Sequence, residues 1–296
     1  NYGSAVKLLE RRARKELQIP NDYAIIACCN ATAGLQTIYS VLEITRGKQQ
    51  KATQAFTFPS SFLGDAKNSE VYDLDYSDNI NLKHRIKANI VTVTNVFGHV
   101  QELETILNSG YTIVFDNAAT PFSFFKGKNT CSLGFASVIS LHHTKPLGFG
   151  EGGLIIINRR HEKLTRDLIN FGNGNLVILP KSSNSKMSEL SAAGILQYWD
   201  TNPVEAKKET YCHNYFNLKN KLLSKYKGRT LNNYSDENGF FPSCLPFVFD
   251  NKNEADPSLF PGVETRKYYK PLLPFPNSYN LYSRILCFPI YEMYDV

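Results

Sequence analysis

The chemistry-bearing residues of this sequence centre on a lysine, Lys145, which stands just after a short apolar run at residues 135–141. The residues that follow it, PLGFGEGG at 146–153, form a glycine-rich turn. A lysine held beside a buried strand and such a turn is desolvated, which lowers the pKa of its amine and lets it form a Schiff base with an aldehyde. The alternative is an ordinary surface lysine before a loop, and the glycines and glutamate nearby argue against it.

An aspartate, Asp116, ends the apolar run at residues 112–115 and is followed by Asn-Ala-Ala. A carboxylate at the end of a buried strand needs a partner, because an unpaired buried charge is costly. The functional hypothesis is therefore a cationic or protonated group bound beside Asp116. The alternative, in which Asp116 only caps a turn, is common for this residue type.

Two further segments are suited to an anionic, planar ligand. Residues 30–34 (NATAG) open an apolar-striped helix, and the backbone N–H groups at such a start, here those of Thr32 and Ala33, bind anions. Residues 57–61 (TFPSS) present Phe58 to a flat ring, although a core phenylalanine is the ordinary interpretation. An amine for an aldehyde, an acid for a ring nitrogen, an anion site and an aromatic face together describe pyridoxal phosphate.

A mostly parallel sheet is the scaffold expected to position these residues. Short apolar runs rich in β-branched residues alternate with apolar-striped helical segments. We expect strands at 23–29, 90–96, 112–115, 135–141 and 154–157, and helices at 32–44 and near 103–107. This alternation predicts an α/β fold with helices on both faces of the sheet and functional groups at the carboxyl ends of the strands.

Two domains are expected, a large one at residues 1–200 that binds the cofactor and a smaller α+β one at 201–296. The pattern changes near residue 200, where a polar helical stretch at 204–225 precedes loops rich in Pro, Asn and Tyr. A short strand is expected after these loops, at 244–249.

Composition and charge exclude several classes of protein. With 42% hydrophobic and 20% charged residues among 296, the chain can bury a core, and no apolar run reaches the about 18 residues of a membrane helix. The net charge of +6 is spread along the chain without basic–aromatic clusters, so neither a nucleic acid nor a membrane is expected as a partner. Six cysteines without a Cys-x-x-Cys pair indicate a reduced, cytoplasmic protein, and no metal site is assigned.

The order of these segments resembles the nucleotide-sugar aminotransferases of the DegT/DnrJ/StrS group, which are fold-type I pyridoxal-phosphate enzymes. The most specific part is the lysine segment at 140–153. The other matching segments are NYG at 1–3, NATAGL at 30–35, TF at 57–58, NVFG at 95–98, NSKMSELSAA at 184–193, GVETRKYYKP at 262–271 and LCFPIY at 286–291. The resemblance implies a seven-stranded, mostly parallel sheet sandwiched by helices, and a homodimer with active sites at the subunit interface.

The resemblance also implies roles for individual residues. Lys145 is expected to bind the cofactor's aldehyde and to act as the general base, and Asp116 to keep the ring nitrogen protonated. His142, three residues before the lysine, is expected to support the catalytic group, unless it is an ordinary core histidine. The cofactor-binding residues implied are Thr32, Ala33 and Ser140 at the phosphate, Phe58 stacked on the ring, and Asn184, which reaches the cofactor of the neighbouring subunit.

The implied reaction moves an amino group from an amino acid, with glutamate as the expected donor, to a nucleotide-linked keto-deoxysugar for surface polysaccharide synthesis. A lysine at position 145 favours amino transfer, since relatives with histidine there catalyse dehydration. The substrate contacts implied are Asn1, Tyr2, Arg266 and the pair Tyr268-Tyr269, and a solvated basic loop is the alternative for Arg266 and the two tyrosines.

Two positions depart from the pattern of this family. Ala119 stands three residues after Asp116, where the family usually has glutamine or histidine, and Leu273 stands where histidine is common. These departures leave two alternatives open. One is a catalytically altered paralogue that binds a sugar nucleotide or regulates a partner, and the other is a pyridoxal-phosphate-dependent sugar dehydratase.

Overall fold

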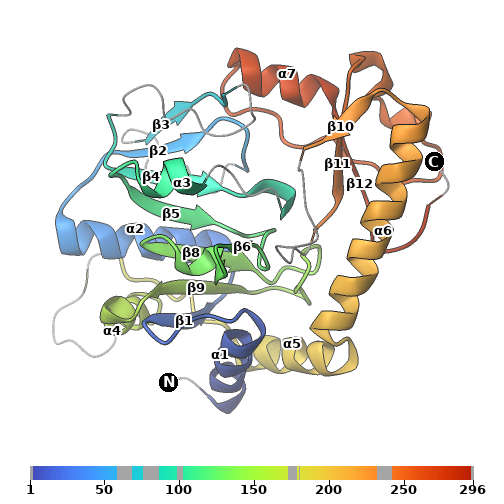
Figure 1. Cartoon of the computed structure of the whole chain (residues 1–296). Coiled ribbons are helices and arrows are strands. Elements are labelled where there is room, and N and C mark those ends of the chain that lie inside the picture. Colours follow the sequence, from blue (N-terminus) through green and yellow to red (C-terminus); the bar gives the residue numbers. More distant parts are fainter. Residues whose placement is uncertain are drawn as a thin grey trace.

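The computed structural model of the chain describes residues 3–58, 69–75, 87–98, 103–172, 179, 181–231 and 242–294. Its centre is a seven-stranded sheet (Figure 1). The strand order is β1 (Tyr23–Cys28), β9 (Gly153–Asn158), β8 (Ala136–Ser140), β5 (Thr112–Asp116), β4 (Ile90–Thr94), β2 (Lys51–Gln54) and β3 (Ser69–Tyr72). β9 is antiparallel to both neighbours and the remaining pairs are parallel, so the prediction of a mostly parallel sheet is confirmed.

The strands form because their residues are β-branched or small and are covered on both faces. Every residue of β4 (IVTVT) and of β8 (ASVIS) is buried. The link from β8 to β9, residues 141–152, is a loop without a helix, whereas parallel neighbours are usually joined through a crossover helix. Without such a helix the chain returns directly, so β9 is antiparallel to β8 and the loop that carries Lys145 stays at the carboxyl edge of the sheet.

Helices cover both faces of the sheet, as predicted. Alternate residues of β9 show the division: Ile155 and Ile157 pack with α2 (Ala31–Arg46) and α4 (Glu162–Leu168), whereas Leu154 and Ile156 pack with α1 (Ser4–Glu16) and α5 (Glu189–Thr201). The short α3 (Leu103–Leu107) packs on β4 and β5, and a ribbon of β6 (Phe124–Phe125) and β7 (Lys128–Asn129) lies between β5 and β8 in sequence. Among the described residues, no helix is long and apolar enough to cross a membrane.

A buried ion pair closes the edge of the sheet at β1. Glu10 of α1 is 9% exposed, and its Oε1 accepts hydrogen bonds from the Ala27 amide at 2.9 Å and from Arg166 Nη1 at 3.0 Å. Its Oε2 accepts a second bond from Arg166 Nη2 at 2.8 Å. The edge amide of β1 is thereby paired and covered, which keeps this strand from pairing with another chain.

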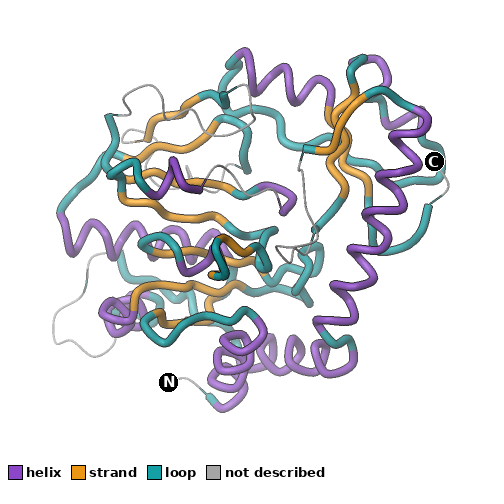
Figure 2. Tube along the Cα trace, in the orientation of Figure 1, coloured by secondary structure: helices purple, strands orange, loops and turns teal. Residues whose placement is uncertain are grey.

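The C-terminal part is a smaller α+β unit. The long α6 (Val204–Lys225) packs on an antiparallel sheet of β10 (Gly228–Thr230), β11 (Leu245–Phe249) and β12 (Ile285–Phe288), and Figure 2 shows the helix alongside these strands. The helix matches the predicted range 204–225, and β11 lies within the predicted strand at 244–249. α5 ends at Thr201 and α6 begins at Val204, close to the proposed boundary at residue 200, which stays a prediction.

A half-buried aspartate ties this C-terminal part to the large sheet. Asp73 follows the edge strand β3 and caps α7 (Pro276–Arg284) from outside that helix. The amides of Asn277 and Ser278 donate to Asp73 at 3.0 and 2.9 Å, and the Ser278 hydroxyl donates at 2.6 Å. An apolar cluster beside this cap joins Phe56 and Phe97 of the large unit to residues of β11 and β12.

Candidate active site

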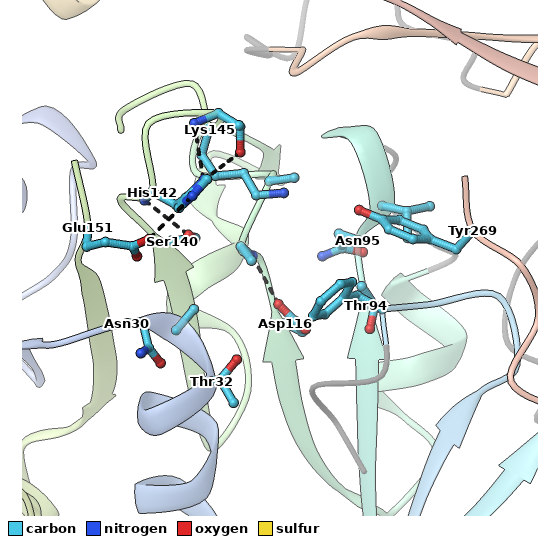
Figure 3. A pocket seen from close by; sticks show the side chains of 16 residues that line it. Asn30, Thr32, Thr94, Asn95, Asp116, Ser140, His142, Lys145, Glu151 and Tyr269 are labelled. Carbon is cyan, nitrogen blue, oxygen red and sulfur yellow. Dashed lines mark hydrogen bonds and ion pairs between the residues drawn. The ribbon is translucent and has the colours of Figure 1, made fainter. Parts of the chain in front are cut away.

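A cavity of about 400 Å³ opens at the carboxyl ends of β4, β5 and β8 (Figure 3). The start of α2 and the C-terminal part complete its wall. This position agrees with the expectation that functional groups gather at the carboxyl ends of the parallel strands. The described residues that line it are Asn30, Ala31, Thr32, Phe58, Thr94, Asn95, Val96, Asp116, Ala118, Ala119, Ser140, His142, Thr144, Lys145, Glu151 and Tyr269.

Lys145 sits in a loop that is folded tightly by its own backbone. The Lys145 amide donates to the carbonyl of His142 at 2.8 Å, and the Gly148 amide donates to the carbonyl of Lys145 at 2.9 Å. A Cβ atom added at Gly148 would lie 1.7 Å from the His142 carbonyl oxygen, so no other residue fits without moving the loop. Glycine at position 148 therefore permits the tight backbone turn that holds the lysine loop in this conformation.

The same loop is anchored to α5 by a buried indole. Trp199 Nε1 donates to the carbonyl of Leu147 at 3.0 Å, and Trp199 is 1% exposed. Next to it, the rings of Phe149 and Tyr198 stack at 5.3 Å between centroids. The lysine loop is thus fixed by contacts with the helix beneath it and with its own backbone.

The amine of Lys145 points into the cavity (Figure 3). Burial lowers its pKa, and the attraction of the Asp116 carboxylate opposes part of this effect. A lowered pKa increases the share of neutral amine at neutral pH, which is the form that attacks a carbonyl and accepts a proton. The structure therefore supports the desolvated amine that the sequence indicated.

Asp116 lies at the end of β5 and is 3% exposed. Its Oδ1 accepts a hydrogen bond from the Ala118 amide at 3.1 Å, which orients the carboxylate into the cavity (Figure 3). The next residue, Asn117, is fully buried and joins the strand ends: its Oδ1 accepts from Asn95 at 2.6 Å and its Nδ2 donates to Ser137 at 3.2 Å. Neither Asn117 nor Asn95 was predicted as a site residue, because buried amides give no pattern in the sequence.

The anion-binding end of the cavity is formed by the first turn of α2. Asn30 caps this helix, and its Oδ1 accepts the Ala33 amide at 2.8 Å. The Ala33 amide donates to this cap and Ala33 is not among the lining residues, and its predicted contact with a phosphate stays a prediction. Thr32 and Ser140 do line the cavity, and the positive end of the helix dipole favours an anion there.

His142 belongs to the cavity wall and not to the core. Its Nδ1 shares a hydrogen bond with Thr144 Oγ1 at 2.8 Å, and its Nε2 lies 3.4 Å from Glu151 Oε1. Glu151, which sequence reasoning treated only as part of the glycine-rich turn, also lines the cavity. The two contacts fix the histidine ring beside the lysine loop, where it was expected.

An aromatic wall stands opposite the lysine. Tyr269 stacks on Phe97 at 5.3 Å with an interplanar angle of 5°, and its hydroxyl points across the cavity toward the Lys145 amine (Figure 3). Burial raises the pKa of Tyr269. Phe58 also lines the cavity, with its ring edge-on to Tyr269 at 6.1 Å, and its predicted stacking on a bound ring stays a prediction.

Two of the predicted substrate contacts lie outside this cavity. Tyr268 is 41% exposed and Arg266 is paired with Glu264, and neither lines the cavity. Their contact with a substrate stays a prediction, whereas Tyr269, the second tyrosine of the pair, lines the cavity. Asn1 and Tyr2 lie outside the described residues.

Asn184 and Ala119 lie at different places relative to the cavity. Asn184 lies outside the cavity of its own chain and accepts a hydrogen bond from Lys186 Nζ at 2.8 Å. Its role in the site of a neighbouring subunit stays a prediction. Ala119 places a methyl group in the cavity wall, whereas Leu273 is exposed and lies outside it.

The residues fit pyridoxal phosphate. One cavity contains a desolvated amine for the aldehyde, a buried carboxylate for the ring nitrogen, and a helix start with two hydroxyl side chains for the phosphate. The aromatic wall supplies the apolar boundary that excludes water. The volume of about 400 Å³ lies in the range of small-molecule sites.

Comparisons with known proteins point in the same direction. The family model described as the DegT/DnrJ/EryC1/StrS aminotransferase family matches residues 1–218. A DegT DnrJ EryC1 StrS aminotransferase from Brucella abortus is 21% identical, with a TM-score of 0.81 over 97% of this chain and 85% of that chain.

Two further solved structures are similar in fold. Helicobacter pylori PseC, described as an aminotransferase involved in the biosynthesis of pseudoaminic acid, is 15% identical, with a TM-score of 0.82 over 97% of this chain and 86% of that one. DesI, determined in the presence of its TDP-sugar product, is 22% identical, with a TM-score of 0.80 over 98% of this chain and 80% of that one.

Proposed function

Because the chain belongs to the DegT/DnrJ/EryC1/StrS aminotransferase family, we propose that it moves an amino group from glutamate to a nucleotide-linked keto-deoxysugar. Family members depend on pyridoxal phosphate, and the chain is an enzyme of this kind. The observation that carries the proposal is the meeting of Lys145 and Asp116 in one cavity. The proposal includes a homodimer and a role in surface polysaccharide synthesis.

Each cofactor-binding residue of the cavity has a distinct task in the proposed site. Pyridoxal phosphate, when bound, supplies an electron sink that stabilises negative charge on the carbon next to the amino group. Lys145 would hold its aldehyde, and Asp116 would keep its ring nitrogen protonated. Thr32 and Ser140 would bind its phosphate at the start of α2, and Phe58 would cover its ring.

Lys145 would also move the proton. Since burial lowers the pKa of its amine, the neutral amine takes a proton from the substrate carbon without first losing one of its own. His142, fixed by Thr144 and Glu151, orients the loop on which this amine sits. Tyr269 forms the opposite wall, so a sugar substrate would enter between Tyr269 and the lysine loop.

The sugar-nucleotide part of the proposal draws on the relatives. PseC is described as taking part in pseudoaminic acid biosynthesis, and DesI was determined with a TDP-sugar product. The substrates of those proteins suggest which probes to use. In this proposal the cofactor and the sugar would occupy the cavity of about 400 Å³, and the nucleotide would extend outside it.

The half-reaction with glutamate tests the proposal directly. Purified protein loaded with pyridoxal phosphate is mixed with glutamate, and 2-oxoglutarate is measured together with the absorbance of the lysine-bound cofactor. We expect Lys145→Ala to abolish both signals, and the exposed Lys163→Ala, on α4, to leave both unchanged. An active Lys145→Ala variant would contradict the assignment of the lysine.

The second substrate is then identified by mass spectrometry. Protein preloaded with the amino group is offered keto-deoxysugars linked to dTDP, UDP or GDP, and we expect a product in which the C=O group has become CH–NH2, so that O is replaced by one N and three H overall. Loss of water from a sugar without transfer of the amino group would instead identify a dehydratase.

One feature favours a second candidate, a protein that binds a sugar nucleotide without turning it over. The methyl group of Ala119 lines the cavity where the family usually has a polar side chain. A protein that binds pyridoxal phosphate and a nucleotide sugar, but forms no 2-oxoglutarate from glutamate, would be this paralogue.

A further inference from the structure

A second cavity, of about 320 Å³, lies at the opposite edge of the large sheet, away from the candidate active site. It is formed at the amino ends of β5 and β8, the carboxyl end of the antiparallel β9 and the last turn of α2. α2 thus begins at one cavity and ends at the other. Nothing in the proposed aminotransferase reaction uses this second cavity.

Two arginines face this cavity from different elements. Arg46, in the last turn of α2, donates from Nη1 to Thr112 Oγ1 at 2.7 Å, and its guanidinium lies 5.1 Å from the centre of the Phe135 ring. Arg160, just after β9, donates from Nε to His161 Nε2 at 3.0 Å. Each guanidinium has further donors beyond these contacts, because it carries five N–H groups.

The positive charge here is not neutralised by neighbours. Within the described part of the chain, neither Arg46 nor Arg160 forms an ion pair with a carboxylate, and no acidic side chain lines the cavity. The same positive charge acts on His161: burial is the largest cause that lowers its pKa, and repulsion by Arg160 and Arg46 lowers it further. Arginine guanidinium groups without acidic partners are suited to bind phosphate, because their N–H groups match its oxygens.

The remaining wall is aromatic and apolar. Tyr111, Phe135 and Leu133 line the cavity beside the arginines. Arg46 and His161 cover the Phe135 ring, and a flat heterocycle can stack on a ring such as that of Tyr111. The volume of about 320 Å³ is close to the lower limit of small-molecule sites, which suits a mononucleotide better than a complete nucleotide sugar.

We propose that this cavity is a second binding site for a nucleoside monophosphate, with the phosphate held by Arg46 and Arg160 and the base against Tyr111. The site is separate from the cavity that contains Lys145. Its existence does not depend on the proposed transfer to a keto-sugar.

The test uses the holoenzyme, titrated with UMP, dTMP or inorganic phosphate in an isothermal titration calorimeter at low and moderate salt. We expect one of the nucleotides to bind, to bind more weakly as salt rises, and to bind at least tenfold more weakly to Arg46→Gln and Arg160→Gln. The exposed Arg11→Gln, on α1, changes the net charge equally and should bind like the unmodified chain.

Three outcomes would overturn the proposal. They are no binding of either nucleotide, equal binding by all four proteins, and binding of inorganic phosphate as tight as that of the nucleotides. Equal unfolding midpoints of the variants, together with an unchanged glutamate half-reaction, separate loss of this site from misfolding. A failed half-reaction in the unmodified protein would count against the proposed function and leave the nucleotide titration valid.

Discussion

Replacing Asp73 with alanine should loosen the attachment of the C-terminal part to the sheet. The substitution removes the cap of α7, which costs about 0.5–2 kcal/mol in comparable helices. It also leaves the hydroxyl of Ser278, a residue with 0% exposure, without its acceptor, at about 1–3 kcal/mol for an unpaired buried group. Together we expect a loss of about 1.5–5 kcal/mol in the free energy of unfolding.

Urea unfolding followed by circular dichroism measures this loss, since the midpoint falls with stability when the slope is unchanged. Asp73→Asn keeps one acceptor oxygen and should lose less. Asp256→Ala is the matched control, because Asp256 Oδ1 accepts the Ser258 amide at 2.9 Å in an equivalent cap on an exposed turn. An Asp73→Ala midpoint equal to that of the unmodified protein or of the control would refute the reasoning.

Three other substitutions have defined outcomes. Lys145→Met should leave the cofactor-free protein at least as stable as the unmodified chain at pH 7, because a lysine whose pKa is lowered by folding costs stability while it is charged. This cost disappears as the pH rises toward 10.5, so the urea midpoints of the two proteins should differ most at pH 7 and converge at pH 10.5. A clearly lower midpoint of the variant at pH 7 would contradict this. Gly148→Ala should lower the free energy of unfolding by about 1–3 kcal/mol and abolish the absorbance of the lysine-bound cofactor, because the added Cβ would lie 1.7 Å from the His142 carbonyl oxygen. Gly110→Ala, at φ +79° with open space around it, is the control and should keep the absorbance. Glu10→Ala should cost about 1–3 kcal/mol by thermal unfolding, because it leaves the buried Ala27 amide without its acceptor, whereas Arg166 keeps its ion pair with Glu162, and an unchanged unfolding temperature would contradict this.

Much of the fold could be predicted because β-branched runs and helical stripes report burial directly. The strands at 112–115 and 135–141 were found in this way, and Asp116 and Lys145 were found because they follow such runs. The direction of β9 was not predicted, because an apolar run has no direction and the helix-free link from β8 sets it. Similarly, α1 and α5 were absent from the expected elements, although residues within them belong to the family resemblance.

The candidate site was predicted where a residue type alone implies chemistry and missed where geometry decides. The sequence alone does not distinguish Thr32 from Ala33 as an anion-binding residue. The structure does, because the Ala33 amide donates to the Asn30 side chain. Tyr268 and Tyr269 are chemically identical, so the inward ring could not be chosen before the packing against Phe97 was seen.

The indole that holds the lysine loop has a practical consequence. Trp199 is the only tryptophan of the chain, so its fluorescence comes from a single place. That place is bonded to the carbonyl of Leu147, two residues from Lys145. The unlabelled protein therefore carries its own optical reporter of the lysine loop, and a change in emission on adding pyridoxal phosphate or glutamate would report movement where the amine is attached.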